Sequence, residues 1–177
     1  MNPMADLLIR PMVEPDLLAY KALRDAMLAG HPEAFTSDAE TEGRRDLASY
    51  RNRLTGGAGG STLFTLVALD GASLVGALTC EREPRRNVQH LAHLIGMMVA
   101  DTHAGRGIGR ALLQEAITRL KATPGLAQVT LSVTASNRAA VGLYASQGFE
   151  RYGSLPDAIR LPDGRRLAKD LMRLTLL

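Results

Sequence analysis

Three glycines alternate along a short segment in the middle of the chain, at Gly105, Gly107 and Gly109. An apolar, strand-like run ends just before them, and an amphipathic helical pattern begins directly after them. Glycine lets a ligand approach the backbone closely, and the unpaired N–H groups of a first helical turn carry the positive end of the helix dipole. The segment therefore predicts a site for a phosphate or pyrophosphate group, the alternative being a turn that binds nothing.

Two common nucleotide-binding motifs do not fit this segment. A dinucleotide fingerprint, Gly-x-Gly-x-x-Gly, would need glycine where the chain has Arg110 or Leu112. A Walker A motif would need Gly-Lys-Ser/Thr, which the sequence does not contain. The pattern thus indicates a phosphate-bearing ligand other than NAD or ATP.

The residues from 99 to 113 resemble the loop with which GNAT N-acetyltransferases bind the pyrophosphate of acetyl-CoA, whose core is Arg/Gln-x-x-Gly-x-Gly/Ala. Gly107 and Gly109 match the two small-residue positions. Ala104 stands where the family usually has arginine or glutamine, and Arg106 and Arg110 are the candidates to replace that side chain. By this resemblance the residues that hold the cofactor here are Ala104, Gly105, Arg106, Gly107, Ile108, Gly109 and Arg110.

A second segment resembles the same family independently. Residues 137 to 149 match its pattern Asn-x-x-Ala-x-x-Leu-Tyr-x-x-x-Gly-Phe through Asn137, Ala140, Tyr144 and Gly148. The two motifs stand in the family's order and spacing, and the resemblance covers roughly residues 62–174. It implies an acetyl-CoA-dependent N-acetyltransferase.

The resemblance also implies where the thioester of acetyl-CoA lies. It places the thioester where the strands at 88–99 and 128–133 separate, so that the backbone of Met97, Met98 and Val99 is free to pair with pantetheine. A backbone N–H near Val99 would polarise the thioester carbonyl. Such preorganised donors typically supply about 3 kcal/mol of transition-state stabilisation.

Three side chains of the second motif acquire roles by the same resemblance. Tyr144 is expected to donate a proton to the departing CoA thiolate, while Asn137 and Ala140 contact the pantetheine arm. Taken alone, these residues have simpler interpretations. Tyr144 would pack on the face of its helix, and Asn137 would be a helix N-cap, a role that can coexist with cofactor binding.

The general base is harder to assign, because the long strand at 88–99 contains no carboxylate. It does contain His90 and His93, whose side chains point to opposite faces of a regular strand unless a bulge intervenes. His90 aligns with a histidine of similar sequences and suits deprotonation of an ammonium group; a structural role for His90, with a water chain as base, is the alternative. The two histidines do not form a metal site, and Cys80 is expected to be a core residue rather than a nucleophile.

The elements that must position these residues alternate along the chain. We expect strands at 7–12, 62–69, 73–80, 88–99, 128–133, 149–155 and 167–174, and helices at about 16–30, 38–54, 108–120 and 137–147. A capping box from Ser37 to Glu40 would start the second helix, and Asp70-Gly71 predicts a type I′ hairpin turn. The expected fold class is α/β, with elements in the order β-α-α-β-β-β-α-β-α-β-β. The resemblance implies that they form one GNAT-like domain over 1–177, with a mixed central sheet flanked by helices.

Composition excludes several other classes of protein. The 177 residues are enough for about one domain. The net charge of +3 and the absence of tryptophan argue against a nucleic-acid partner. The longest uncharged apolar stretch, 94–100, is far shorter than the roughly 20 residues of a membrane-spanning helix. The single cysteine fits a reducing compartment, so we expect a cytoplasmic protein.

The acceptor is the part that the sequence defines least. The stretch 31–35 and the acidic residues Asp38, Glu40 and Glu42 are candidates to border its site, and a solvated helix face is the alternative. We expect a primary amine of a small molecule, ahead of a peptide or protein amine. A non-catalytic acyl-CoA-binding or sensor domain is the alternative function, and a homodimer is left open because dimers are common among similar proteins.

Overall fold

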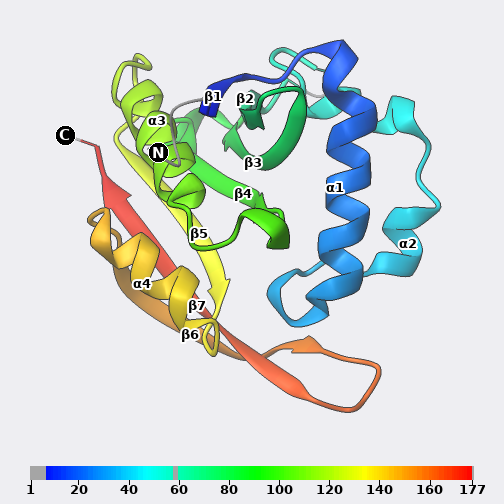
Figure 1. Cartoon of the computed structure of the whole chain (residues 1–177). Coiled ribbons are helices and arrows are strands. Elements are labelled where there is room, and N and C mark those ends of the chain that lie inside the picture. The colour runs from blue at the N-terminus through cyan, green and yellow to red at the C-terminus, as the bar shows by residue number, and fades with distance from the viewer. Residues whose placement is uncertain (1–6, 58–59, 177) are drawn as a thin grey trace.

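Seven strands form one sheet in the order β1-β2-β3-β4-β5-β7-β6 (Figure 1). This computed structural model describes residues 7–57 and 60–176. Neighbouring strands are antiparallel except β4 and β5, which run parallel. The bounds are β1 Leu7–Pro11, β2 Thr62–Asp70, β3 Ser73–Arg82, β4 Leu91–Val99, β5 Gln128–Thr134, β6 Glu150–Arg160 and β7 Arg166–Thr175.

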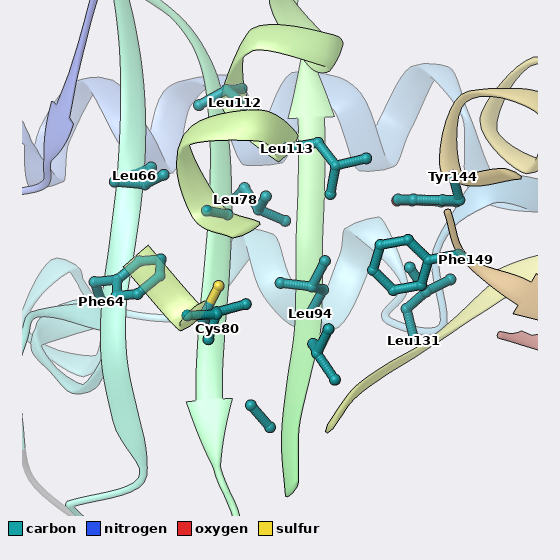
Figure 2. Close-up of a cluster of buried hydrophobic side chains, with 14 of the residues drawn as sticks. Phe64, Leu66, Leu78, Cys80, Leu94, Leu112, Leu113, Leu131, Tyr144 and Phe149 are labelled. Atoms are coloured by element: carbon teal, nitrogen blue, oxygen red, sulfur yellow. The ribbon is translucent and has the colours of Figure 1, made fainter. Parts of the chain in front are cut away.

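Helices cover both faces of this sheet (Figure 1). Alternating side chains of β2 divide the core, since Leu66 packs with the cluster that includes helix α3, whereas Val67 packs with Tyr20 of helix α1. Figure 2 shows the first cluster, in which Leu112 and Leu113 lie over the strands and Tyr144 and Phe149 close one end. The helices are α1 Leu17–Gly30, α2 Ala39–Gly43, α3 Ile108–Lys121 and α4 Arg138–Ser146.

The parallel pair β4 and β5 separates toward its carboxyl ends (Figure 1). The ladder between them has three residue pairs, the last of which is His93 opposite Thr130. Beyond that pair the two strands diverge, and β5 continues to pair with β7 up to Thr134 opposite Lys169. The edge of β4 that faces β5 is therefore open to a ligand from Leu94 onward, as the family resemblance implied for these two strands.

A bulge in β4 lies within this open part. Ala77 of β3 lies opposite Met98 and Thr79 opposite Ile95, so Leu78 alone faces both Gly96 and Met97. Gly96 adopts a φ of 60°, which residues with a side chain rarely adopt. The extra residue reverses the alternation of side chains. Before it Leu94 faces the α3 side, and after it Met97 does.

The segment after α1 departs from the expected helix at 38–54. Only α2 is α-helical there, and Leu47–Arg53 forms a separate 3-10 turn. Asp38, rather than Ser37, caps α2 by accepting from the backbone N–H of Thr41, and Asp46 caps the second turn in the same way. Two consecutive caps start two short helices, so the capping-box interpretation was wrong in both residue and length.

Two smaller expectations also need correction. The strand expected at 88–99 begins at Leu91, because residues 86–88 form a 3-10 turn, so His90 precedes β4 rather than lying in it. In the β2–β3 hairpin Asp70 pairs with Ser73. A type I′ turn at 70–71 requires a positive φ at both residues, but only Gly71 has one, at 59°. The hairpin itself is confirmed.

The remaining elements agree with the sequence to within a few residues, including α3, α4, β5 and the β6–β7 hairpin. Gly148 has a φ of 92° one residue beyond Gln147, the C-cap of α4, which is the left-handed conformation that commonly ends a helix. Of the glycine-rich loop at 56–60, residues 58 and 59 lie outside the described residues. Within the described parts of the chain, no helix is long and apolar enough to span a membrane.

Candidate active site

A cavity of about 690 Å³ lies at the carboxyl end of β4. Its wall combines the last residues of β4, the glycine-rich turn before α3, the start of α4 and the end of α1. The structure therefore brings together the two sequence motifs at 99–113 and 137–149, which are not adjacent in the chain. The expected site residues in this wall are Met97, Met98, Val99, Ala104, Gly105, Gly107, Ile108, Gly109, Arg110, Asn137 and Ala140.

The glycine-rich turn presents its backbone to this cavity. Gly105 and Gly107 have φ values of 73° and 80°, and Gly107 is the N-cap of α3. The N–H of Ala111 donates to the carbonyl of Gly107, which leaves the N–H groups of 108–110 outside the bonding of the helix. Together with the helix dipole these donors suit an anion, so the geometry of the turn supports the expected pyrophosphate site.

The structure separates the two arginines proposed to replace the side chain missing at Ala104. Arg110 lines the cavity beside Ala104. Arg106 is not part of the wall, and its Nη1 donates to Asp70 Oδ2 at 3.2 Å. His103 Nε2 contacts the same carboxylate oxygen at 3.1 Å. Arg110 is thus the better placed of the two to meet a phosphate.

Asn137 has both of the features that the sequence suggested. Its side-chain oxygen accepts from the N–H of Ala140 at 3.2 Å, which caps α4. Asn137 and Ala140 both line the large cavity. Asn137 therefore caps α4 and lines the cavity at the same time.

Tyr144 lies where the large cavity meets a second, smaller one. The smaller cavity, of about 190 Å³, occupies the separation between β4 and β5, and Tyr144 lines it. The Tyr144 hydroxyl donates to Met97 Sδ at 3.2 Å, and its ring contacts Phe149 edge to face (Figure 2). Burial raises the pKa of Tyr144 to about 12, which keeps its proton in place at neutral pH.

The two cavities share part of their walls. Phe35, Met97 and Asn137 line both, and so does Ala34. The Tyr144–Met97 contact therefore stands at the junction between them. A thioether sulfur is a weak acceptor, so the Tyr144 hydroxyl can exchange it for a better partner at modest cost.

Lys169 lines the smaller cavity, and the sequence did not single it out. Lys169, on β7, donates to the hydroxyls of Thr36 and Ser132, and burial lowers its pKa. A single lysine in a strand carries no sequence signal of a site. Gly96, in contrast, did carry one, since a glycine inside a strand pattern often marks a bulge.

The candidate acceptor segment at 31–35 does border the large cavity. His31, Glu33, Ala34 and Phe35 line it, and His31 Nε2 contacts Asp101 Oδ1 at 2.8 Å. The acidic residues of α2 lie elsewhere: Asp38 is its N-cap, and Glu40 pairs with Arg44 on the surface. Their positions agree with the alternative that the sequence left open, a solvated helix face.

Glu42 faces inward instead and forms a buried polar cluster. It accepts from Arg24 Nε at 2.8 Å and from the Tyr50 hydroxyl at 2.9 Å. Burial disfavours the charged carboxylate, but the hydrogen bonds from Arg24 and Tyr50 outweigh it and lower the pKa of Glu42 to about 2. This cluster holds α2 and the turn after it against α1.

Neither of the histidines expected in the long strand lines the cavities. His90 is exposed in the turn before β4, at the opposite end of the strand from the glycine-rich turn, and lines neither cavity. His93 contacts Thr130 and Glu83 through its two ring nitrogens. The structure thus does not support His90 as the base. Cys80 is fully buried in the core, which raises the pKa of its thiol well above the usual value.

The chain is similar to known acetyltransferases. The Acetyltransferase (GNAT) family pattern matches residues 20–149. The N-alpha-acetyltransferase RimI of Mycobacterium tuberculosis is 38% identical over 109 residues, which are 62% of this chain and 59% of that protein. The chain spans between 44% and 61% of the length of the curated relatives that it matches.

Solved structures resemble the whole fold. An acetyltransferase of the GNAT family from Streptococcus pneumoniae superposes with a TM-score of 0.81 at 25% identity, covering 96% of this chain and 99% of that one. A Salmonella typhimurium protein, solved with its cofactor acetyl-CoA, superposes with a TM-score of 0.79 at 21% identity and covers 98% and 95%. At that identity the second comparison supports the fold alone.

Proposed function

The chain belongs to the acetyltransferase (GNAT) family, and we propose that it transfers an acetyl group from acetyl-CoA directly to a primary amine of a small molecule. The proposal rests on one observation. The glycine-rich turn, Met97 and Tyr144 line two cavities that meet at the Tyr144–Met97 contact. An anion site and a proton donor are thereby joined along one path.

The cofactor fits this path in one orientation. The pyrophosphate would bind the N–H groups at 108–110 and Arg110, and pantetheine would run along the open edge of β4 past Asn137. The thioester then reaches Met97 and Tyr144, at the entrance to the smaller cavity. The acceptor would occupy that smaller cavity, so both substrates are bound at once and transfer needs no covalent enzyme intermediate.

The reaction balances with the groups at this junction. The neutral amine nitrogen attacks the thioester carbonyl carbon, the C–N bond forms, and the C–S bond breaks. Tyr144 donates its proton to the departing thiolate and is reprotonated by the proton that the attacking nitrogen releases. Backbone N–H groups beside the Gly96 bulge are suited to stabilise the oxyanion. The products are an N-acetylated amine and CoA with a free thiol.

The proton of the acceptor ammonium needs a route out of the site. His90 lines neither cavity, so we assign this role to a chain of water molecules. The acceptor is proposed to be small because the cavity beyond Tyr144 measures only about 190 Å³, below the roughly 300–1,000 Å³ of typical ligand pockets. We further propose one acetyltransferase domain over residues 1–177 and a cytoplasmic location.

The names of relatives favour a second class of acceptor. The Mycobacterium tuberculosis relative is called an N-alpha-acetyltransferase, a name that denotes acetylation of terminal amines. A peptide or protein N-terminus is therefore the competing acceptor. A non-catalytic acyl-CoA-binding domain is the competing function, and the test below separates all three.

The test is an amine-library screen that reads the release of free CoA thiol from acetyl-CoA, with small amines and peptides in parallel. Thermal denaturation with and without acetyl-CoA is measured on the same protein to establish cofactor binding. We expect thermal stabilisation and thiol release with at least one small amine. Stabilisation with no release across the whole panel would identify a binding domain, and release with peptides alone would exclude the small-molecule acceptor.

A further inference from the structure

The smaller cavity contains a cation without a matching anion. Lys169 is half-buried, and its Nζ donates to the hydroxyls of Thr36 and Ser132, the second at 3.4 Å. Within residues 7–57 and 60–176, none of the ion pairs includes Lys169. The adjacent Asp170 points to the other side of the strand and pairs with Arg151.

The rest of this cavity is uncharged. Among the described residues that line this cavity, Lys169 is the only one with a charged side chain, and Thr36, Ser132 and Tyr144 contribute hydroxyl groups. Removing a lysine partly from water without a counter-ion is unfavourable, which is also why its pKa is lowered. An anion bound beside Lys169 would restore the missing partner, with two hydroxyls to complete its hydrogen bonds.

The position of Lys169 relative to the reaction centre specifies what that anion is. Lys169, Tyr144 and the bulge residues Gly96 and Met97 line the same small cavity. An acceptor whose amine meets the thioester at Tyr144 would hold its other polar group close to Lys169. Much of the rest of the wall is apolar and includes Phe35, Ile95 and Leu131.

We propose that the acceptor is a small amine that carries a carboxylate next to its amino group, a free α-amino acid with an apolar side chain, and that Lys169 binds this carboxylate. The inference rests on the proposed acetyltransferase function and narrows its substrate class. A peptide N-terminus is a poor match, because its neighbouring carboxylate has been converted to an amide.

Two variants and a control test the role of Lys169. Lys169→Met removes the charge and keeps most of the stem, Lys169→Arg keeps the charge, and Lys121→Met removes an exposed lysine at the end of α3, outside both cavities. Each is assayed for thiol release with apolar amino acids such as leucine and with their amides. Because an amide also changes the basicity of the amine, each acceptor is compared across variants and not with the other acceptor.

We expect Lys169→Met to lower kcat/KM for the free amino acid by about tenfold or more, which is about 1.4 kcal/mol, while the amide loses little. Lys169→Arg should retain most of the activity with the free acid, and Lys121→Met all of it. Equal losses with acid and amide would overturn the proposal. Loss in Lys169→Arg as complete as in Lys169→Met would also overturn it, since a proton-transfer role would explain that result.

A binding measurement separates failure of this inference from failure of the proposed function. CoA-loaded protein is titrated with 4-methylpentanoate, which has the carboxylate of leucine but no amine. We expect saturable binding to the wild type and at least about tenfold weaker binding to Lys169→Met. If no amine is acetylated and the carboxylate still binds through Lys169, the transferase function fails and the anion site stands. Absence of Lys169-dependent binding would refute the anion site.

Discussion

The type of a side chain does not by itself show whether the side chain lies in the candidate site. Tyr144 would be an ordinary helix residue without its position at the junction of the two cavities, where its hydroxyl meets Met97. His90 has the better chemistry for a base, yet it lies in an exposed turn before β4. The type of a residue therefore indicates which chemistry it could perform, and its place relative to the strand ends determines whether it reaches the site.

Tyr144→Phe tests the proton donor. Removing the hydroxyl takes the proton away from the leaving thiolate and keeps the ring contact with Phe149, so we expect kcat to fall by about 10²-fold. The dissociation constant for acetyl-CoA should change little. His90→Ala is the control and should leave kcat unaltered. Steady-state kinetics on an identified acceptor measure both, and normal turnover in Tyr144→Phe would remove Tyr144 from the mechanism.

Asn137 tests whether one residue serves the helix and the cofactor together. Asn137→Ala loses the cap on α4 and should cost about 1 kcal/mol of unfolding free energy. Asn137→Ser keeps a capping oxygen and loses the amide. We expect Asn137→Ser to retain stability in urea denaturation while binding acetyl-CoA more weakly. Unchanged affinity in Asn137→Ser would leave Asn137 with the capping role alone.

At the scale of elements, local signals predicted what lies within a strand or helix better than what joins them. Apolar runs joined by a turn placed β2 and β3, which are buried on both faces. Alternation placed β5, and helical spacing placed α3 and α4, because each of these buries one regular face. The helix expected at 38–54 failed where Asp46 starts a new turn and Glu42 turns inward to Arg24. That pairing spans 18 residues, and no local pattern encodes it.

The turn before α3 can be tested with a matched pair of glycines. Gly107 and Gly164 both have positive φ, 80° and 89°, and a Cβ at either would meet nothing within 4 Å. Alanine at each should cost a similar 1–2 kcal/mol or so in stability through backbone strain. Only Gly107→Ala should weaken acetyl-CoA binding, by on the order of tenfold. Calorimetric titration that finds equal affinity in both variants would contradict the pyrophosphate site.

The buried cluster around Glu42 predicts an acid-sensitive contact between α1 and α2. The pKa of Glu42 is lowered from 4.5 to about 2, so its contribution to stability is present above pH 4.5 and is lost as the pH falls toward 2. Glu42→Gln leaves Arg24 buried without a charged partner and should cost about 3 kcal/mol at neutral pH. It should also flatten the fall in stability below pH 4.5.

The control for this prediction lies on the same helix. Glu40 pairs with Arg44 on the surface, where both side chains are more than three quarters exposed, at 77% and 78%. Glu40→Gln should therefore change the unfolding free energy by less than about 1 kcal/mol. Urea denaturation at several pH values measures both variants. An acid profile of Glu42→Gln that matches the wild type would show that Glu42 is not responsible.

For the molecule as a whole, the sequence predicted the class of fold and offered candidate residues for a cofactor site, but it did not point to the smaller cavity that we propose for the acceptor. The glycine-rich turn and the Asn137 segment are continuous in sequence, and each carries its motif within a few residues. The smaller cavity is assembled from the loop after α1, β4, β5, α4 and β7, with single residues such as Lys169 contributed from far along the chain. Only the folded sheet, with β4 and β5 separated, brings them together.

In the proposed complex the pantetheine arm runs from the glycine-rich turn to the junction at Tyr144. The most direct measurement is the separation between the CoA sulfur and Tyr144 Oη in a crystal structure of the complex. We expect the sulfur to replace Met97 Sδ as the partner of the Tyr144 hydroxyl, with the pyrophosphate on the N–H groups at 108–110. A CoA molecule with its thiol outside hydrogen-bond distance of Tyr144, or its pyrophosphate away from this turn, would contradict it.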